Sequence, residues 1–332
     1  MSQLGFFDLQ NRLNSLSKSG DPLVLLKNKI QWLKFNSTLS KALKKDRKSN
    51  AGRKPYSPLL MFKILILQSL YNLSDEQMEF MIKDRLSFMR FLELDFNEKV
   101  PDEKTIWHYR ELFVNANILE KLFSKFNQQL DAMGLKASHG TLIDASIVPV
   151  PIQRNKRDEN NEIKGGSIPS EWKKKPSKLC QKDVDARWTK KNGKSYYGYK
   201  MHINADNKHK LIRKVKVTTS SVHDSQVFEE LICKNTSKEV WADSAYYHKR
   251  HVLPSGYREH IHRKGKRGLP LSEFQQALNK KRSQVRCRVE HVFGTIKGTM
   301  KLFVRTVGFK RAEAKVLLSS ITYNMMRSIR IA

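Results

Sequence analysis

Three carboxylate side chains occupy positions at which their residue types are unexpected. Asp144 lies inside the alternating stretch TLIDASIV, and Asp243 ends the short apolar stretch VWAD; both stretches predict β-strands. Aspartate is disfavoured inside strands because its short charged side chain packs poorly. Glu290 lies within residues 285–298, where apolar residues recur at the spacing of a buried helix face. If the three side chains meet, their mutual repulsion requires a divalent cation.

The chemistry open to such a cluster is metal-dependent phosphoryl transfer. Carboxylate oxygens favour Mg²⁺ or Mn²⁺. Two such ions can act together, one activating water or a 3′-hydroxyl and the other stabilising the leaving oxygen. The simpler interpretation of a mid-strand aspartate is a satisfied polar residue or an edge position. Asp224 could also replace Asp243 as a ligand, although Asp224 or Ser221 more simply caps the helix that follows.

Two cations flank Glu290 on the predicted helix. Arg286 lies one helical turn before it and Lys297 two turns after it, so the three side chains share a narrow stripe. The stripe borders the predicted buried face, which consists of Val289, Val292, Phe293 and Ile296. The simple interpretation is an exposed Arg–Glu pair worth roughly 0.2–0.5 kcal/mol. The alternative is a cleft at the edge of the packed face.

Other catalytic motifs are missing from the sequence. His, Asp and Ser occur together, but no GxSxG nucleophile elbow is present. The glycines among lysines in KNGKSYYG and HRKGKRG do not fit the phosphate loop GxxxxGK[ST], and we expect no nucleotide cofactor. Paired carboxylates could serve a glycosidase, but the charge of the chain disfavours that activity.

The chain is strongly basic throughout. Its 332 residues include 63 Lys and Arg against 32 Asp and Glu, a formal charge of +31. Self-repulsion of this size makes a nucleic acid the expected partner, with a membrane surface as the weaker alternative. The apolar run from Leu59 is too short to cross a membrane, and the first residues do not form a signal peptide. Three isolated cysteines suggest a reducing compartment, so we expect a cytoplasmic protein.

Residues 1–135 predict a helical domain. Ser74 and the glutamine three residues later have the spacing of a capping box, and Asp102 is a predicted N-cap. The helix after Asp102 carries Trp107 and Arg110, which suggests a helix-turn-helix-like DNA reader with Arg110 as a DNA contact. A plain helical bundle used for dimerisation is an equal alternative.

Residues 136–332 predict a mixed α/β domain. After the strand of Asp144, YYGYKMHINAD and LIRKVKVTTSS predict a hairpin. HDSQVFEELI then predicts a helix, and EVWADSAYY predicts the strand of Asp243. The helix of Glu290 follows near the end. The expected fold class is therefore a helical N-terminal domain followed by a mixed α/β domain.

A basic loop at about residues 151–195 interrupts the strands. Trp172 and Trp188 are interleaved with its lysines, which include Lys190 and Lys191. Such a loop could track a DNA backbone while its aromatic rings stack on exposed bases. The alternative is a solvated insertion, and it is slightly favoured for any single residue.

Taken in order, these stretches resemble the DDE transposases of bacterial insertion sequences, specifically the insertion-sequence-five family. The resemblance runs from about Tyr56 to Met326. YSPLLMFKILILQSLYNL through VPDEKTIWHYR resembles that family's N-terminal domain. TLIDASIV and VWADSAYY resemble the strands of its two aspartates, and RVEHVFGTIK its glutamate helix. Each stretch is only moderately specific, but the whole series in this order is highly specific.

The resemblance implies a ribonuclease-H-like catalytic domain in which Asp144, Asp243 and Glu290 bind two Mg²⁺ or Mn²⁺ ions. The related Tyr-Arg-Glu-Lys signature is matched by Arg286 and Lys297, which would hold phosphates of the DNA end beside the metal site. Ser283 stands where that signature has tyrosine. This departure affects a phosphate or base-stacking contact, and not the metal ligands.

The expected function is that of a transposase. Such an enzyme binds the terminal inverted repeats of its element, hydrolyses a phosphodiester at each end and joins the freed 3′-hydroxyl to target DNA. It would act on double-stranded DNA as a homodimer or higher oligomer, in a bacterial cytoplasm and associated with the nucleoid. Two alternatives remain: a catalytically silent transposase derivative acting as a repressor, and a ribonuclease-H-like nuclease that cuts without joining.

Overall fold

The computed structural model divides the chain into two compact units. The described residues are residue 5 and residues 7–43, 54–191, 193–233, 237–247 and 253–331. The helical unit comprises residues 1–133 and 321–332, and the sheet unit comprises residues 134–320. The end of the last helix groups with the helical unit.

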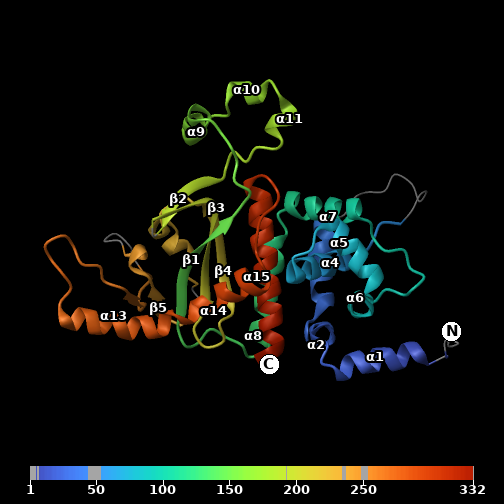
Figure 1. Ribbon diagram of the computed structural model, residues 1–332. Helices are drawn as coiled ribbons and strands as arrows, with labels where there is room; N and C mark the ends of the chain where they lie inside the picture. Colours follow the sequence, from blue (N-terminus) through green and yellow to red (C-terminus); the bar gives the residue numbers. More distant parts are fainter. Residues whose placement is uncertain are drawn as a thin grey trace. The chain divides into compact units, whose positions relative to one another are not determined.

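The helical unit consists of short helices around an apolar core (Figure 1). Residues Met61–Ser69 of its fourth helix are all buried, because that helix is apolar almost throughout. The predicted capping box is confirmed: Ser74 Oγ accepts from Gln77 N, and Gln77 Oε1 accepts from Ser74 N. Asp102 likewise caps the next long helix, where its Oδ1 accepts from Thr105 N at 2.7 Å. The elements are α1 (Asp8–Lys18), α2 (Pro22–Lys29), η1 (Trp32–Phe35), α3 (Asn36–Leu43), α4 (Pro58–Tyr71), α5 (Asp75–Asp84), α6 (Leu86–Leu92), α7 (Glu103–Asn115) and α8 (Leu119–Ala132).

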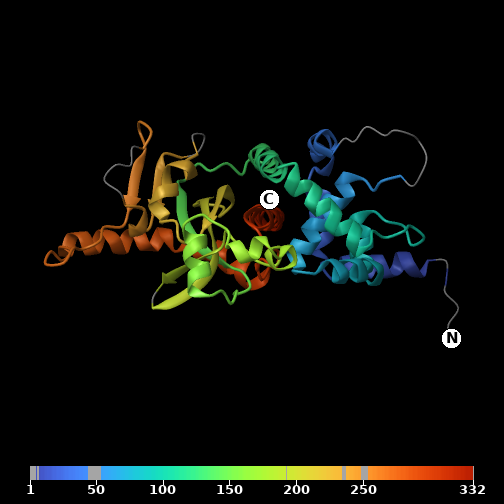
Figure 2. The same cartoon turned by 90° about the horizontal axis from the view of Figure 1, so that it is seen from above.

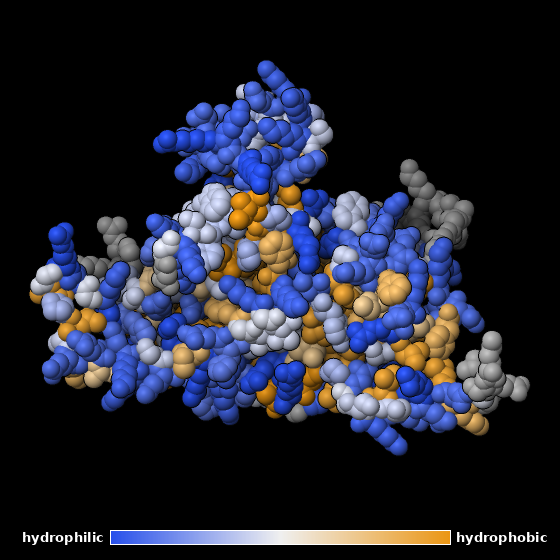
Figure 3. All heavy atoms as spheres, in the orientation of Figure 1, coloured by the Kyte–Doolittle hydropathy of each residue, from blue (hydrophilic) through white to orange (hydrophobic). Residues whose placement is uncertain are grey.

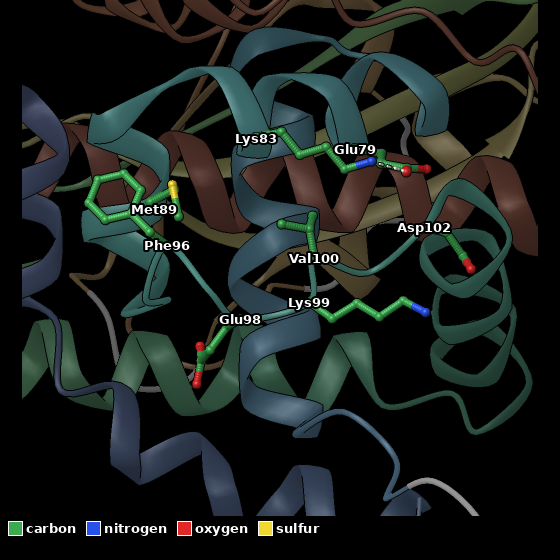
Figure 4. A pocket seen from close by; sticks show the side chains of 8 residues that line it. All are labelled: Glu79, Lys83, Met89, Phe96, Glu98, Lys99, Val100 and Asp102. Carbon is green, nitrogen blue, oxygen red and sulfur yellow. Dashed lines mark hydrogen bonds and ion pairs between the residues drawn. The ribbon is translucent and has the colours of Figure 1, made fainter.

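A cavity of about 360 Å³ lies in the helical unit (Figure 4). Among its lining residues, Lys83 Nζ pairs with Glu79 Oε1 at 2.5 Å. The other charged side chains carry both signs and do not point toward one spot in the cavity. The lining residues are Glu79, Lys83, Met89, Phe96, Glu98, Lys99, Val100 and Asp102. This arrangement lacks the convergent polar groups of a catalytic pocket.

The sheet unit is built on a mixed sheet of six strands within the described ranges. The order is β2-β3-β1-β5-β6, with β4 paired to β3. β1 is antiparallel to β3 and parallel to β5, and β5 is parallel to β6. The predicted hairpin is confirmed as the antiparallel pair β3–β4. The strands are β1 (Thr141–Pro149), β2 (Arg187–Lys191), β3 (Lys194–Asp206), β4 (Ile212–Thr219), β5 (Glu239–Ala242) and β6 (Arg258–Ile261).

This arrangement confirms the predicted fold class, a helical N-terminal part followed by a mixed α/β part. Antiparallel strands come first along the chain, and the two strands parallel to β1 follow. Gly198 permits the close pairing of β1 and β3. Its φ is 147°, and a Cβ there would lie 2.3 Å from Val148 O.

Phe228, Leu231 and Tyr246, which come from helices and turns, pack against a group of buried strand residues and form one apolar cluster with them. The stretch HDSQVFEELI, predicted as one helix, forms a 3₁₀ turn followed by a four-residue helix. His223 caps the turn, and not Asp224 or Ser221 as expected, because its ring nitrogen accepts from Ser225 N. The elements are η2 (Asp224–Val227), α12 (Phe228–Leu231), η3 (Ser244–Tyr246), α13 (Glu273–Arg286), α14 (Arg288–Gly294), the π-helical turn η4 (Thr295–Thr299) and α15 (Phe309–Ile331).

The segment between β1 and β2 is a small folded insertion, and not the loop predicted there. It contains α9 (Arg157–Lys164), α10 (Ser170–Lys173) and α11 (Pro176–Leu179). The visible face of this insertion is almost entirely hydrophilic (Figure 3). The last part of the predicted loop, from Arg187 onward, forms β2 and the start of β3.

Trp172 forms the centre of the insertion. Its side chain is fully buried, and its Nε1 donates to Glu159 Oε1 at 2.7 Å. The ammonium groups of Lys178 and Lys182 lie 5.5 and 5.0 Å from the centre of its ring. The prediction that Trp172 stacks on DNA bases is therefore wrong: the ring holds the insertion together and has no free face. Trp188 on β2 is 43% exposed.

Candidate active site

Asp144 lies in the middle of β1, with 17% of its side chain exposed. Its Oδ1 accepts from Ala145 N at 2.8 Å, and its Oδ2 accepts from Arg286 Nη1 at 2.9 Å. The pKa of Asp144 is raised to about 6, chiefly by burial and to a smaller extent by the negative charge of Asp243, while Arg286, the Ala145 N–H and Lys191 act to lower it. A carboxylate in this environment is one that an additional cation would stabilise.

Asp243 is the first residue after β5, where it caps η3. Its Oδ1 accepts from Ser244 N and, at 3.1 Å, from Ser244 Oγ. The parallel register pairs Ile143 with Ala242, so the residues that follow, Asp144 and Asp243, stand at matching positions on neighbouring strands. Side chains at matching positions of parallel strands point to the same face of a sheet. The sheet therefore places the two aspartates next to each other.

Glu290 lies on α14, which packs against β1. The predicted buried face of this helix is confirmed: Val289, Val292, Phe293 and Ile296 are all buried. The Glu290 side chain is 67% exposed, and its Oε1 lies 3.8 Å from Arg286 Nη2. Since Nη1 of the same guanidinium binds Asp144, Arg286 lies between two of the three predicted metal ligands.

The predicted continuous helix over residues 285–298 is interrupted twice. α13 ends at Arg286, α14 begins at Arg288, and the π-helical turn η4 follows from Thr295. The junction at Cys287 turns Arg286 toward Asp144 while leaving Glu290 on the next helix. π-helical turns are rare and often occur at functional sites, because they displace side chains from the regular helical stripe.

Lys297 lies on η4. Loss of solvent around its ammonium lowers its pKa, although much of the residue is exposed, and the charge of Lys191 lowers it further. Lys191 also acts on the pKa of Asp144. Lys191 thus lies near both Asp144 and Lys297, so Arg286, Lys191 and Lys297 form a group of three cations that begins beside Asp144. Mutual repulsion among them is relieved when a phosphate approaches.

The remaining predicted DNA contacts lie on α7 of the helical unit and on β2 of the sheet unit. Arg110 belongs to the helical unit, where its Nη1 and Nη2 both bind the carboxylate of Asp75, at 2.6 and 2.7 Å. Its guanidinium is already used inside the unit, which gives no support to a DNA contact there. Lys190 and Trp188 are exposed on β2. Their contacts with DNA stay predictions.

The residues around Asp144 fit a divalent cation. Carboxylate oxygens are the donors that Mg²⁺ and Mn²⁺ prefer. The hydroxyl of Tyr246 is buried without a hydrogen-bond partner in the described part of the chain. Burial raises its pKa, as do the charges of Asp144, Asp224 and Asp243, so it is a protonated donor close to these carboxylates. As they stand, the described His, Cys, Asp and Glu side chains nowhere gather in a group of three that could hold an ion. To bind an ion, Asp144 and Glu290 would have to release Arg286, which contacts both carboxylates.

Asp224, the rival ligand, has a different partner. Its Oδ1 accepts from Lys200 Nζ at 2.9 Å, and the same ammonium donates to Val222 O at 2.7 Å. The ion pair is three-quarters or more buried on both sides. Sequence reasoning missed Lys200, Tyr246 and His262 near the site, because their proximity depends on strand pairings that no local pattern reveals.

In the part of the chain that the structure describes, no helix is both long and apolar enough to span a membrane. Two family models match the sequence. One, "Transposase domain (DUF772)", matches residues 11–112, and the other, "Transposase DDE domain", matches residues 137–325. Among solved structures, the chain is similar to the piggyBac transposase in a synaptic complex with hairpin DNA, with 13% sequence identity and a TM-score of 0.43. That match covers 92% of this chain and 74% of the other.

Proposed function

Because this chain belongs to the DDE transposase family, we propose that it cuts the terminal inverted repeats of its own mobile element and joins the freed 3′-hydroxyls to target DNA. One observation carries the proposal. The parallel register of β1 and β5 aligns Asp144 with Asp243, and Arg286 lies between Asp144 and Glu290. Two neighbouring aspartates, with a glutamate joined to one of them through Arg286, favour phosphodiester chemistry at this edge of the sheet. The order of the sequence motifs also suggests the insertion-sequence-five group.

Asp144, Asp243 and Glu290 would hold two Mg²⁺ or Mn²⁺ ions. The ions would supply the charge that activates the attacking water or 3′-hydroxyl and stabilises the leaving oxygen. The protein's own residues do the rest. Arg286 leaves Asp144 and binds a non-bridging phosphate oxygen, since its fork matches both carboxylate and phosphate. Lys191 and Lys297 neutralise neighbouring phosphates and fix the strand beside the carboxylates.

The two ends of an element must be handled together, so we expect a homodimer or a higher oligomer on DNA. The basic face of the insertion, including Lys173, Lys174 and Lys175, adds phosphate contacts away from the carboxylates. Its folded structure favours a rigid backbone contact over a loop that orders on binding. Trp188, whose ring is partly exposed on β2, is the remaining aromatic candidate for stacking on a base.

The test is a cleavage assay on a plasmid that carries the gene with its native flanking DNA. Purified protein is compared with Glu290→Gln and with Glu273→Gln, an exposed glutamate on α13 that serves as matched control. We expect Mg²⁺-dependent breaks at two flanking inverted repeats, with joined products. The Glu273→Gln protein should give the same breaks, whereas the Glu290→Gln protein and a chelator should abolish them.

The two alternatives give different results in this assay. A repressor derived from a transposase binds the flanks and produces no breaks in any metal. A nuclease produces nicked or linear DNA without joined products and without regard to the flanks. Either result contradicts the proposed transposase.

A further inference from the structure

The segment that follows β6 is fixed to α13 by three residues on one side of that helix. Arg282 Nη1 donates to Ile261 O at 2.7 Å. Asn279 accepts from Arg263 N at 3.0 Å through Oδ1 and donates to Arg263 O at 2.9 Å through Nδ2. Between them, Ser283 Oγ lies 3.4 Å from His262 Nε2. α13 packs against β5, and Figures 1 and 2 show the helix beside this edge of the sheet.

The sheet extends the alignment of Asp144 and Asp243 by one more strand. β5 and β6 are parallel, and their register pairs Ala242 with Ile261. The ladder continues by one step, since His262 N donates to Ala242 O at 3.3 Å. Asp144 within β1, and Asp243 and His262 directly after β5 and β6, therefore occupy three matching positions in a row. Ligands commonly bind at the carboxyl ends of parallel strands, which is where Asp243 and His262 lie.

The charges of the site reach His262. Partial burial and the positive charge of Arg286 lower the pKa of its imidazole, whereas Asp243 raises it. The residue is half-buried, and the basic residues that follow it, Arg263, Lys264 and Lys266, are exposed. An imidazole here is no part of the apolar core, and it is not the hard oxygen ligand that Mg²⁺ prefers. Because matching positions of parallel strands point to one face of a sheet, its side chain lies on the same face as that of Asp243.

We propose that His262, oriented by Ser283, donates a hydrogen bond to a phosphate of the DNA strand that is cut, and so positions that strand against Asp243. The inference rests on the proposed function. His262 is a positioning residue: it contacts the DNA backbone near the scissile bond but takes no part in the chemistry. Ser283 interacts with one ring nitrogen of His262 and so fixes the orientation of the ring. The other ring nitrogen is then directed toward the phosphate.

The experiment uses the full chain and synthetic element ends, once the plasmid assay has identified them. Phosphates near the cleavage position are replaced one at a time by uncharged methylphosphonates. Binding is measured in chelator, and cleavage in Mg²⁺. For the wild type we expect about a 10- to 100-fold loss of cleavage at one position close to the scissile bond, the size expected for a hydrogen bond to a charged group.

The variants decide the assignment. The His262→Leu protein should show the same loss of cleavage with unmodified DNA. A methylphosphonate at the sensitive phosphate should then reduce its cleavage hardly any further. His262→Gln, which keeps a donor, should retain part of the sensitivity. Ser283→Ala should show a smaller defect that is not additive with His262→Leu. Gln284→Ala, an exposed neighbour on α13, should resemble the wild type.

A methylphosphonate profile that is identical in His262→Leu and the wild type would overturn the inference. So would a His262→Leu defect that is equal at all positions, or one that follows the thermal unfolding midpoint alone. Failure of the proposed function looks different, because Glu290→Gln would then cleave as well as the wild type, whatever the residue at 262.

Discussion

Two buried aspartates in the sheet unit have opposite environments. Asp183, which follows the insertion, is 2% exposed, and its carboxylate accepts hydrogen bonds from three backbone N–H groups and from the hydroxyl of Tyr199. Burial and the charge of Asp183 raise the pKa of Tyr199, so the hydroxyl stays a donor. Asp144 accepts from one backbone N–H and from Arg286.

The difference separates a carboxylate that serves the fold from one that serves a ligand. Asp183 is surrounded by fixed donors from the segment after it, from β3 and from the start of α15, and these satisfy its charge without a counter-ion. Asp144 is largely buried with few donors, next to a second carboxylate, and depends on a single cationic side chain, that of Arg286. In such an environment the ionised carboxylate is destabilised, and a bound cation would stabilise it.

The first prediction tests the Asp144 side of the comparison. Asp144→Asn should reduce cleavage far more than the roughly 10- to 100-fold caused by losing a residue behind metal ligands. Binding to the element ends in chelator should stay near the wild-type level, because the fold and the cations around the site remain. Parallel cleavage and binding titrations measure both. Loss of binding together with cleavage would contradict the assignment of Asp144 as a ligand.

The same substitution gives a prediction of stability against pH. The pKa of Asp144 in the folded state is about 6, against an ordinary value of 3.8, so the folded protein binds more protons between these values. The stabilisation from this proton is complete below about pH 4 and is lost as pH rises through 6. Without metal, the Asp144→Asn protein should therefore gain stability relative to the wild type over this range, by up to about 3 kcal/mol. Urea unfolding at pH 4.5 and 7.5 measures the free energy of unfolding of both proteins. An equal change between the two pH values in wild type and variant would contradict the prediction.

The second prediction concerns Asp183. Asp183→Asn puts an NH₂ group where an acceptor is required, leaving buried donors without partners, so we expect a loss of roughly 2–4 kcal/mol in the free energy of unfolding. Activity per folded molecule should change little. Asp158→Asn, at an exposed carboxylate of α9, is the matched control and should stay within about 0.5 kcal/mol of the wild type. A stable Asp183→Asn protein without cleavage activity would reverse the roles assigned to the two regions.

The sequence predicted those features that depend on local periodicity. The alternation around Asp144, the buried face beside Glu290 and the capping box at Ser74 each involve neighbours within one element. Features that depend on distant partners were missed. The burial of Trp172 depends on Glu159, and the position of His262 depends on the register of β5 with β6. No local pattern contains these pairings.

The third prediction concerns the cations around Asp144. Lys191→Gln and Lys297→Gln should each reduce the slope of log affinity against log salt by about 1, because each lysine releases roughly one counter-ion when it binds a phosphate. The effect on affinity should be similar for element ends and unrelated DNA. Lys310→Gln, at an exposed lysine of α15, is the control. Unchanged slopes in both variants would place the DNA elsewhere on the sheet unit.

The smallest effect is expected for Tyr246→Phe. The hydroxyl of Tyr246 is buried, and it makes no hydrogen bond within the described ranges, so its removal should leave the free energy of unfolding within about 1 kcal/mol of the wild type or raise it. Stability in metal should differ. If the hydroxyl donates to a carboxylate once Arg286 has moved away, Mg²⁺ should raise the unfolding midpoint of the wild type more than that of the variant. Equal shifts would mean that Tyr246 only fills space under β5, and that the environment of Asp144 alone distinguishes the site from the region of Asp183.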